Sequence, residues 1–258
     1  MEVREKMLPV LGPKGGEEEV QALREVIESG WWGKGPKVSE FEEKFAEMVG
    51  HKYAVAVTSN SHGQDLVMKA MGFNGVDVIN PAISFIATAM VPLWNNCTSN
   101  IVDVKRDTLC IDPDDVERYK KSNSEVLIAV DEAGVFADYE NLRKKFGGFI
   151  LQDCAHSCWT PGAGLDGDVA VWSFQAVKTM PAGDGGMITT NDKLLAERFD
   201  DLKNPPAVNR PEERDGFNEI SMKFHIKFHP VVKFPSPTAS RQLDHAPRIS
   251  FLKVRIFK

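Results

Sequence analysis

Cysteine is scarce in the 258-residue sequence, and its spacing excludes the cysteine-rich classes of protein. The four cysteines are Cys97, Cys110, Cys154 and Cys158, and none forms a C-x-x-C pair. Such a low density is not that of a disulfide-stapled domain, and a zinc site needs cysteine or histidine partners at better spacing. We therefore expect free thiols, a reducing compartment and no metal site.

Long apolar runs and an excess of basic residues are also missing. No apolar run reaches the roughly 20 residues that span a bilayer, and the opening MEVREKMLPVLGP has no basic start followed by an apolar stretch, as a signal peptide would. The net charge is −6, whereas a protein whose main role is to bind nucleic acid is usually basic. We expect a cytoplasmic protein with neither a membrane nor a nucleic acid as partner.

The composition is that of an ordinary globular protein. Hydrophobic residues make up 42% and charged residues 26% of the chain. This much apolar material needs burial, which excludes disorder along the whole chain, and the length suits one large domain or two modest ones.

Segments with helical spacing alternate with short apolar segments over the first 200 residues. Helices are expected over 17–29, 38–49, 63–72, 84–94, 112–121, 138–146 and 192–202. Strands are expected over 53–57, 76–79, 100–104, 125–130, 149–152, 169–174 and 187–190. The expected start signals are Ser39, Asp112 and Asn191, and Gly30 and Gly50 are stop signals. The alternation predicts a three-layer α/β/α fold with a mainly parallel sheet.

The character of the chain changes after Asn204. Pro205-Pro206 and the segment NRPEERDG are typical of an exposed linker, and residues 221–258 are basic without a clear helical or strand period. We therefore divide the chain into a domain over 1–204 and a separate region over 205–258.

Ligands of parallel sheets bind beyond the carboxyl ends of the strands, so polar residues just after strands are the first candidates. Lys178 follows a predicted strand and precedes a glycine-rich turn. Burial there would lower the pKa of the amine and make it a nucleophile for carbonyl groups, as a Schiff base requires. Taken alone, the same lysine fits a surface loop better.

Three other candidates have two interpretations each. Asp153 at a strand end could hold a pyridine nitrogen protonated or could cap a turn. His156 could bond a phenolate-like oxygen or be structural, and the turn Thr58-Ser-Asn-Ser61 could bind an anion or merely cap a helix. Phe85 in isolation is most simply a core residue.

Short motifs along the chain point in one direction when they are taken in order. They are Gly30-Trp-Trp-Gly-Lys-Gly-Pro36, Tyr53-Ala-Val-Ala-Val57, Pro81-Ala-Ile-Ser-Phe-Ile-Ala-Thr88, Asp107-Thr-Leu-Cys-Ile-Asp-Pro113, Asp153-Cys-Ala-His156, Ser173-Phe174 with Lys178, and Gly183-Asp-Gly-Gly186. From about residue 9 to residue 204 the chain resembles the DegT/DnrJ/StrS family of pyridoxal 5'-phosphate (PLP) sugar aminotransferases. The resemblance implies that 1–204 is a fold type I, PLP-binding large domain with an N-terminal arm.

The resemblance also implies roles for the candidate residues. Lys178 would form the Schiff base with PLP and then shuttle the substrate proton. Asp153 would pair with the ring nitrogen, His156 would contact the phenolic oxygen, and Phe85 would stack on the ring. The residues implied in binding the phosphate are Ser59, Asn60, Ser61 and Ser173.

The reaction implied is a transamination that belongs to nucleotide-sugar metabolism and polysaccharide biosynthesis. Glutamate or glutamine would load the cofactor, and a keto sugar attached to a nucleotide would receive the amine, in a homodimer. Asn60 departs from the pattern because the family has glycine in this turn, so Asn60 is expected to adopt a backbone conformation that suits glycine. Gly134-Val-Phe-Ala-Asp138 also lacks a polar side chain that relatives carry.

The end of the chain departs further from the family. Relatives are longer and carry a C-terminal domain that closes over the substrate, and Lys227 stands where they have an asparagine that contacts the partner subunit's cofactor. The resemblance therefore suggests a truncated or diverged member, with 205–258 as a linker and a remnant of the C-terminal region. Two alternatives remain: a non-catalytic member that acts as a dimerisation or partner subunit, and a PLP enzyme with another substrate.

Overall fold

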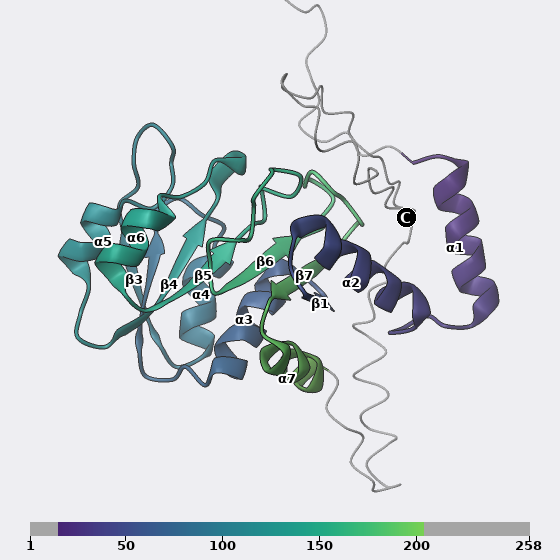
Figure 1. Cartoon of the computed structure of the whole chain (residues 1–258), viewed down its shortest axis with the longest axis horizontal. Helices are drawn as coiled ribbons and strands as arrows, with labels where there is room; N and C mark the ends of the chain where they lie inside the picture. Colours follow the sequence, from purple (N-terminus) through teal and green to yellow (C-terminus); the bar gives the residue numbers. More distant parts are fainter. Residues whose placement is uncertain (1–14, 204–258) are drawn as a thin grey trace, which may run out of the picture.

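The computed structural model describes residues 15–203, which form a seven-stranded sheet covered by helices (Figure 1). The strands are β1 (Tyr53–Val57), β2 (Asp77–Pro81), β3 (Thr98–Val102), β4 (Ser124–Val130), β5 (Phe149–Asp153), β6 (Val169–Ser173) and β7 (Gly186–Thr190). The helices are α1 (Glu17–Ser29), α2 (Pro36–Val49), α3 (Asn60–Met71), α4 (Ala87–Trp94), α5 (Pro113–Tyr119), α6 (Tyr139–Phe146) and α7 (Lys193–Lys203), with a 3-10 turn at Glu132–Gly134.

The sheet is mainly parallel, as the alternation of elements predicts. Its strand order is β1-β7-β6-β5-β4-β2-β3, and β7 runs antiparallel to both of its neighbours, β1 and β6. The other neighbouring pairs are parallel. The carboxyl ends of β2, β4, β5 and β6 therefore lie at one edge of the sheet, where a ligand site is expected.

Helices cover both faces of the sheet, which confirms the α/β class. Side chains along β6 alternate between two clusters, because successive residues of a strand point to opposite faces. Val169 and Val171 pack in the cluster that includes residues of α3, α4 and α7. Ala170 and Trp172 pack in the cluster that includes residues of α2, whose Phe45 meets the Trp172 ring edge-on at 5.2 Å.

Two expected helix starts are wrong, for local reasons. α2 begins at Pro36 with Gly35 as its N-cap, instead of being capped by Ser39, because proline suits the first turn of a helix. α7 is capped by Asp192, whose Oδ1 accepts from the backbone nitrogens of Leu194 (2.8 Å) and Leu195 (3.2 Å). Asn191 instead accepts from the backbone nitrogen of Lys52 at 3.0 Å. Asp112 caps α5 as expected.

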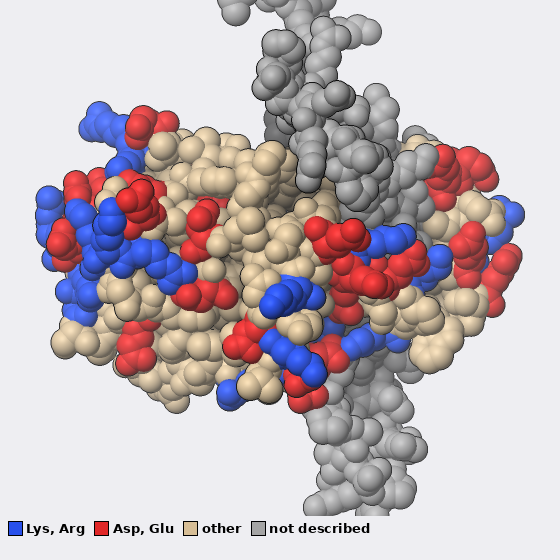
Figure 2. Space-filling view, viewed as in Figure 1, with Lys and Arg blue, Asp and Glu red and all other residues tan. Residues whose placement is uncertain are grey.

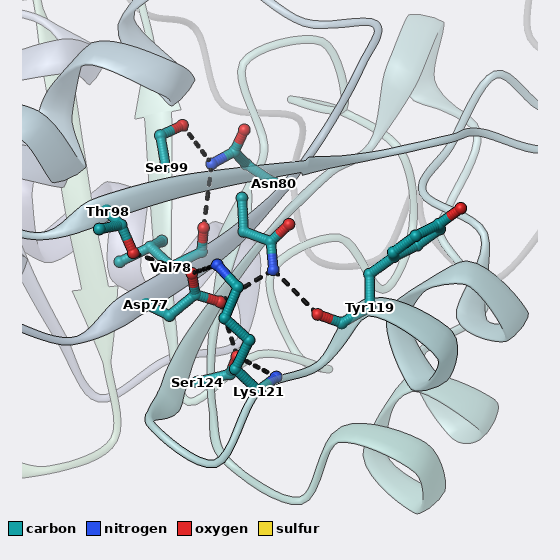
Figure 3. Close-up of polar contacts among 9 residues, drawn as sticks. Asp77, Val78, Asn80, Thr98, Ser99, Tyr119, Lys121 and Ser124 are labelled. Atoms are coloured by element: carbon teal, nitrogen blue, oxygen red, sulfur yellow. Dashed lines mark hydrogen bonds and ion pairs between the residues drawn. The ribbon is translucent and has the colours of Figure 1, made fainter.

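A buried carboxylate ties the amino ends of three strands together (Figure 3). Asp77 opens β2 and is fully buried. It accepts hydrogen bonds from Thr98 Oγ1 (2.8 Å), Asn100 Nδ2 (2.9 Å), Lys121 Nζ (2.6 Å) and Ser124 Oγ (2.6 Å). Burial alone would raise the pKa of Asp77, but these bonds outweigh it and hold the pKa below its ordinary value.

The surface and the cysteines agree with part of the composition argument. On the face drawn in Figure 2, basic and acidic side chains are intermixed over the helices rather than gathered in a single-sign patch. The four cysteines are buried and unpaired. Among residues 15–203, no helix is long and apolar enough to cross a membrane. The expected region 205–258 and Lys227 lie outside the described residues.

Candidate active site

Three of the candidate residues meet at the carboxyl edge of the sheet. Asp153 is the last residue of β5, His156 lies in the turn that follows, and Lys178 lies in the connection from β6 to β7. The charge of Lys178 acts on both Asp153 and His156. The connection is held to the sheet by Phe174, whose backbone pairs with Gly185 and Ala182. The strand-end rule thus placed these residues together.

Asp153 is a buried carboxylate surrounded by neutral donors. Its Oδ1 accepts from Asn60 Nδ2 (2.8 Å) and from the backbone nitrogen of Ala155 (3.0 Å). Its Oδ2 accepts from Gln64 Nε2 at 2.9 Å. Burial raises the pKa of Asp153 more than the hydrogen bonds and the Lys178 charge lower it, so that the pKa lies at about 6. A cation bound at this carboxylate would favour its charged form.

Lys178 carries an amine whose chemistry is set by its half-buried position. Burial lowers the pKa of Lys178, and the negative charges of Asp153 and Glu132 offset part of that effect. A lower pKa leaves more of the amine neutral and nucleophilic at a given pH. The amine thus has the property required for a reaction with a carbonyl carbon.

One ring nitrogen of His156, Nδ1, has two polar neighbours. Its Nδ1 accepts from the backbone nitrogen of Ala133 at 3.3 Å and lies 3.3 Å from Glu132 Oε1. Burial and the Lys178 charge lower the pKa of His156, and Glu132 partly offsets them. The lowered pKa of His156 favours its neutral imidazole relative to an exposed histidine.

The turn between β1 and α3 forms a capped helix start, with one difference from the expectation for Asn60. Ser59 is the N-cap of α3, and its Oγ accepts from the backbone nitrogen of His62 at 3.1 Å. Asn60 is the first residue of the helix and does not adopt a left-handed conformation, so the expectation of a glycine-like backbone is wrong. The first N–H groups of a helix have no carbonyl partner within it and are available to an anion.

The structure also brings Ser173 close to this turn. Ser173 pairs with Gly186 in the β6–β7 register. A Cβ on Gly186 would lie 2.6 Å from the carbonyl carbon of Ser59 and 2.8 Å from the nitrogen of Asn60. The turn therefore rests directly on the start of β7, next to the end of β6. Ser61, the second residue of α3, belongs to the same helix start.

Phe85 is not a core residue. It lies between β2 and α4 and is 72% exposed. Its aromatic face is therefore available to a ligand, while its role against a ring remains a prediction.

Sequence reasoning missed two polar residues of the site, Gln64 and Glu132. Gln64 lies one helical turn after Asn60, a spacing that places two side chains on the same face of a helix. Glu132 comes shortly after the end of β4, so the rule that selected Asp153 applied to it as well. The signals were therefore present in the sequence, in the helical spacing for Gln64 and in the position after a strand for Glu132.

Known proteins match most of the chain in sequence. A model of the DegT/DnrJ/EryC1/StrS aminotransferase family matches residues 13–228. The spore coat polysaccharide biosynthesis protein SpsC of Bacillus subtilis (strain 168) is 36% identical over 204 residues. The match covers 76% of this chain and 52% of SpsC, so the chain spans about half the length of this relative.

Solved structures match the described fold. The putative sugar aminotransferase Spr1654 from Streptococcus pneumoniae, in its PLP form, superposes with a TM-score of 0.70 at 25% identity, over 76% of this chain and 57% of that one. DesI, solved in the presence of its TDP-sugar product, gives a TM-score of 0.71 at 30% identity, over 78% and 53%. The aminotransferase TlmJ from Streptoalloteichus hindustanus gives 0.70 at 32% identity, over 76% and 56%.

Fold, site geometry and sequence similarity thus agree over most of the described residues. The chain belongs to the DegT/DnrJ/EryC1/StrS aminotransferase family.

Proposed function

We propose that this chain carries the cofactor-binding part of a PLP-dependent aminotransferase. It would move an amino group from glutamate or glutamine to a keto sugar attached to a nucleotide. The observation that carries the proposal is that a half-buried amine, Lys178, and a buried carboxylate, Asp153, act on each other's charge at the carboxyl edge of the sheet. The family and the solved relatives in PLP form support the choice of cofactor.

The residues present fit PLP. Among residues 15–203, Asp153 has no ion-pair partner within salt-bridge distance, although its carboxylate is buried and accepts several hydrogen bonds. A protonated ring nitrogen would supply the missing cation. The start of α3 with Ser59, beside Ser173, has the N–H and hydroxyl donors that a phosphate requires.

Each residue would contribute one operation to the reaction. When bound, PLP supplies an electron-accepting ring that stabilises negative charge at the substrate carbon. Lys178 would take the proton from that carbon, and it would return a proton in the second half of the transamination. Asp153 would hold the proton of the ring nitrogen, and His156 would contact the phenolic oxygen.

The remaining predicted residues would position the cofactor. Phe85 would cover one face of the ring, and the phosphate would be held by Ser59, Asn60, Ser61 and Ser173. Fixing both ends of the cofactor orients the reacting carbon toward Lys178, and such orientation supplies a large part of the rate in many enzymes.

The acceptor and the assembly are proposed from the relatives. The name of SpsC places that protein in polysaccharide biosynthesis, and DesI was solved with a TDP-sugar product. A nucleotide-linked keto sugar is the acceptor consistent with both names. We also propose that the protein forms a homodimer.

The visible absorption spectrum of the full chain with added PLP tests the proposal. We expect a visible band that borohydride bleaches, that glutamate or glutamine converts, and that Lys178→Ala abolishes. Lys69→Ala is the control, because Lys69 is an exposed lysine paired with Asp65 on α3. A folded wild-type chain without the band would overturn the proposal and favour the non-catalytic partner subunit.

A further inference from the structure

We propose that Asn60 and Gln64 are positioning residues for Asp153, and that their side-chain amides hold the carboxylate in the orientation that receives the ring nitrogen of the cofactor. The inference rests on the proposed function and adds two residues of α3 to its machinery.

The two amides form one connected clamp. Asn60 Nδ2 donates to Asp153 Oδ1 at 2.8 Å, and Gln64 Nε2 donates to Asp153 Oδ2 at 2.9 Å. Gln64 Nε2 also donates to Asn60 Oδ1 at 2.7 Å. This link turns the side-chain oxygen of Asn60 toward Gln64, and it leaves the side-chain nitrogen of Asn60 to donate to the Asp153 carboxylate. Each carboxylate oxygen thus has a fixed donor, and rotation of the Asp153 side chain would break both bonds.

Packing alone does not explain why a polar glutamine occupies position 64. Its side chain is buried, at 1% exposure, and its Oε1 has no hydrogen-bond partner within residues 15–203. A buried amide oxygen without a partner destabilises a fold, and an apolar side chain would avoid that penalty. The bonds from its nitrogen to Asp153 and Asn60 are the interactions that only an amide provides here.

The clamp also opposes the effect of burial on the charge of Asp153. The pKa of Asp153 lies at about 6, because burial and the Asp131 charge raise it more than the Ala155 backbone, the Asn60 amide and the Lys178 charge lower it. Only the charged carboxylate can hold a protonated ring nitrogen. Loss of an amide would therefore favour the protonated carboxyl and weaken the contact with the ring.

The test compares Asn60→Ala and Gln64→Met with Asn80→Ala in the full chain. Asn80 is a matched control, because its buried amide also has an unpartnered oxygen, while its nitrogen donates to Ser99 Oγ and the Val78 carbonyl instead of to Asp153. An infrared titration of the cofactor-free proteins, with Asp153→Asn as the subtraction, measures the protonation of Asp153. Absorption with added PLP then measures the affinity of each variant for the cofactor.

We expect either clamp variant to raise the titration midpoint of Asp153 by about one pH unit and to weaken PLP binding by about tenfold. Asn80→Ala should leave both values unchanged. Unchanged midpoints and affinities in folded clamp variants would overturn this inference while the proposed function stands. Absence of the PLP band in the wild type would instead overturn the proposed function, and this inference with it.

Circular dichroism establishes that each variant is folded. If Gln64→Met fails to fold, Asn60→Ala carries the test, because Asn60 lies at the partly exposed start of α3.

Discussion

Single side chains of the candidate site owe their chemistry to burial and to a few neighbours. Asp153 and Lys178 carry opposite charges, and burial disfavours the charged form of both. Their mutual attraction acts in the opposite direction. The amine is therefore more reactive than an exposed lysine and less reactive than one buried without a carboxylate nearby.

This balance predicts a pH shift when the carboxylate is neutralised. Asp153 raises the pKa of Lys178, so Asp153→Asn should lower it further and move the midpoint of Lys178 labelling by acetic anhydride to lower pH. Labelling of each lysine is followed by mass spectrometry across a pH series, with Lys69 as the internal control. An unchanged Lys178 profile would show that the two groups do not act on each other.

Elements of the sheet are held in register at the edge opposite the site. The Asp77 cluster joins β2, β3 and the start of β4 through side chains that converge on one carboxylate (Figure 3). Its partners donate to the charged form, and for this reason the pKa of Asp77 lies below its ordinary value. The cluster fixes the amino ends of the strands whose carboxyl ends present the site.

We expect Asp77→Asn to destabilise the protein in a pH-dependent way. A lowered pKa contributes stability above the ordinary aspartate pKa, and this contribution disappears as the pH falls through the folded-state value. At pH 7 the variant should lose about 2 kcal/mol of unfolding free energy. Urea unfolding of both proteins from neutral to acid pH measures the difference, and a gap that persists at the acid end would contradict this explanation.

Most of the described molecule could be predicted from the sequence, and the failures are local. Apolar periodicity found the strands and helices because burial on two faces leaves a clear pattern, as on β6. The start of α2 was misplaced because a serine inside the helix resembled a cap. The contact of Asn60 with Asp153 could not be predicted, since it joins residues far apart in sequence.

The described part of the molecule exposes large apolar side chains on α1 and in the connection that follows it. Figure 1 shows α1 set apart from the sheet, and among the described contacts only Ala22 of α1 is buried. Ile27 is 57% exposed and Trp31 62% exposed. Burial of such side chains against a second copy of the chain would lower the free energy of the assembly.

We therefore expect the full chain to sediment as a dimer, and Ile27→Glu combined with Trp31→Glu to weaken its association at least about tenfold. Leu194→Glu is the matched control, because Leu194 is an apolar residue of α7 that is 76% exposed. Sedimentation equilibrium over a concentration series measures both. A monomeric wild type, or a double variant that associates like the wild type, would refute this assignment.

The position of β1 at one edge of the sheet has a consequence for synthesis. Among the described strands, β1 pairs with β7 alone, and β7 is the last of them in sequence. A chain leaving the ribosome must extend past Thr190 before β1 finds its neighbour, and α2 packs in part on Trp172 of the late strand β6. Contacts between residues so distant in sequence form slowly during folding. β1 therefore pairs only after the β6–β7 hairpin has been made, and the connection within that hairpin carries Lys178.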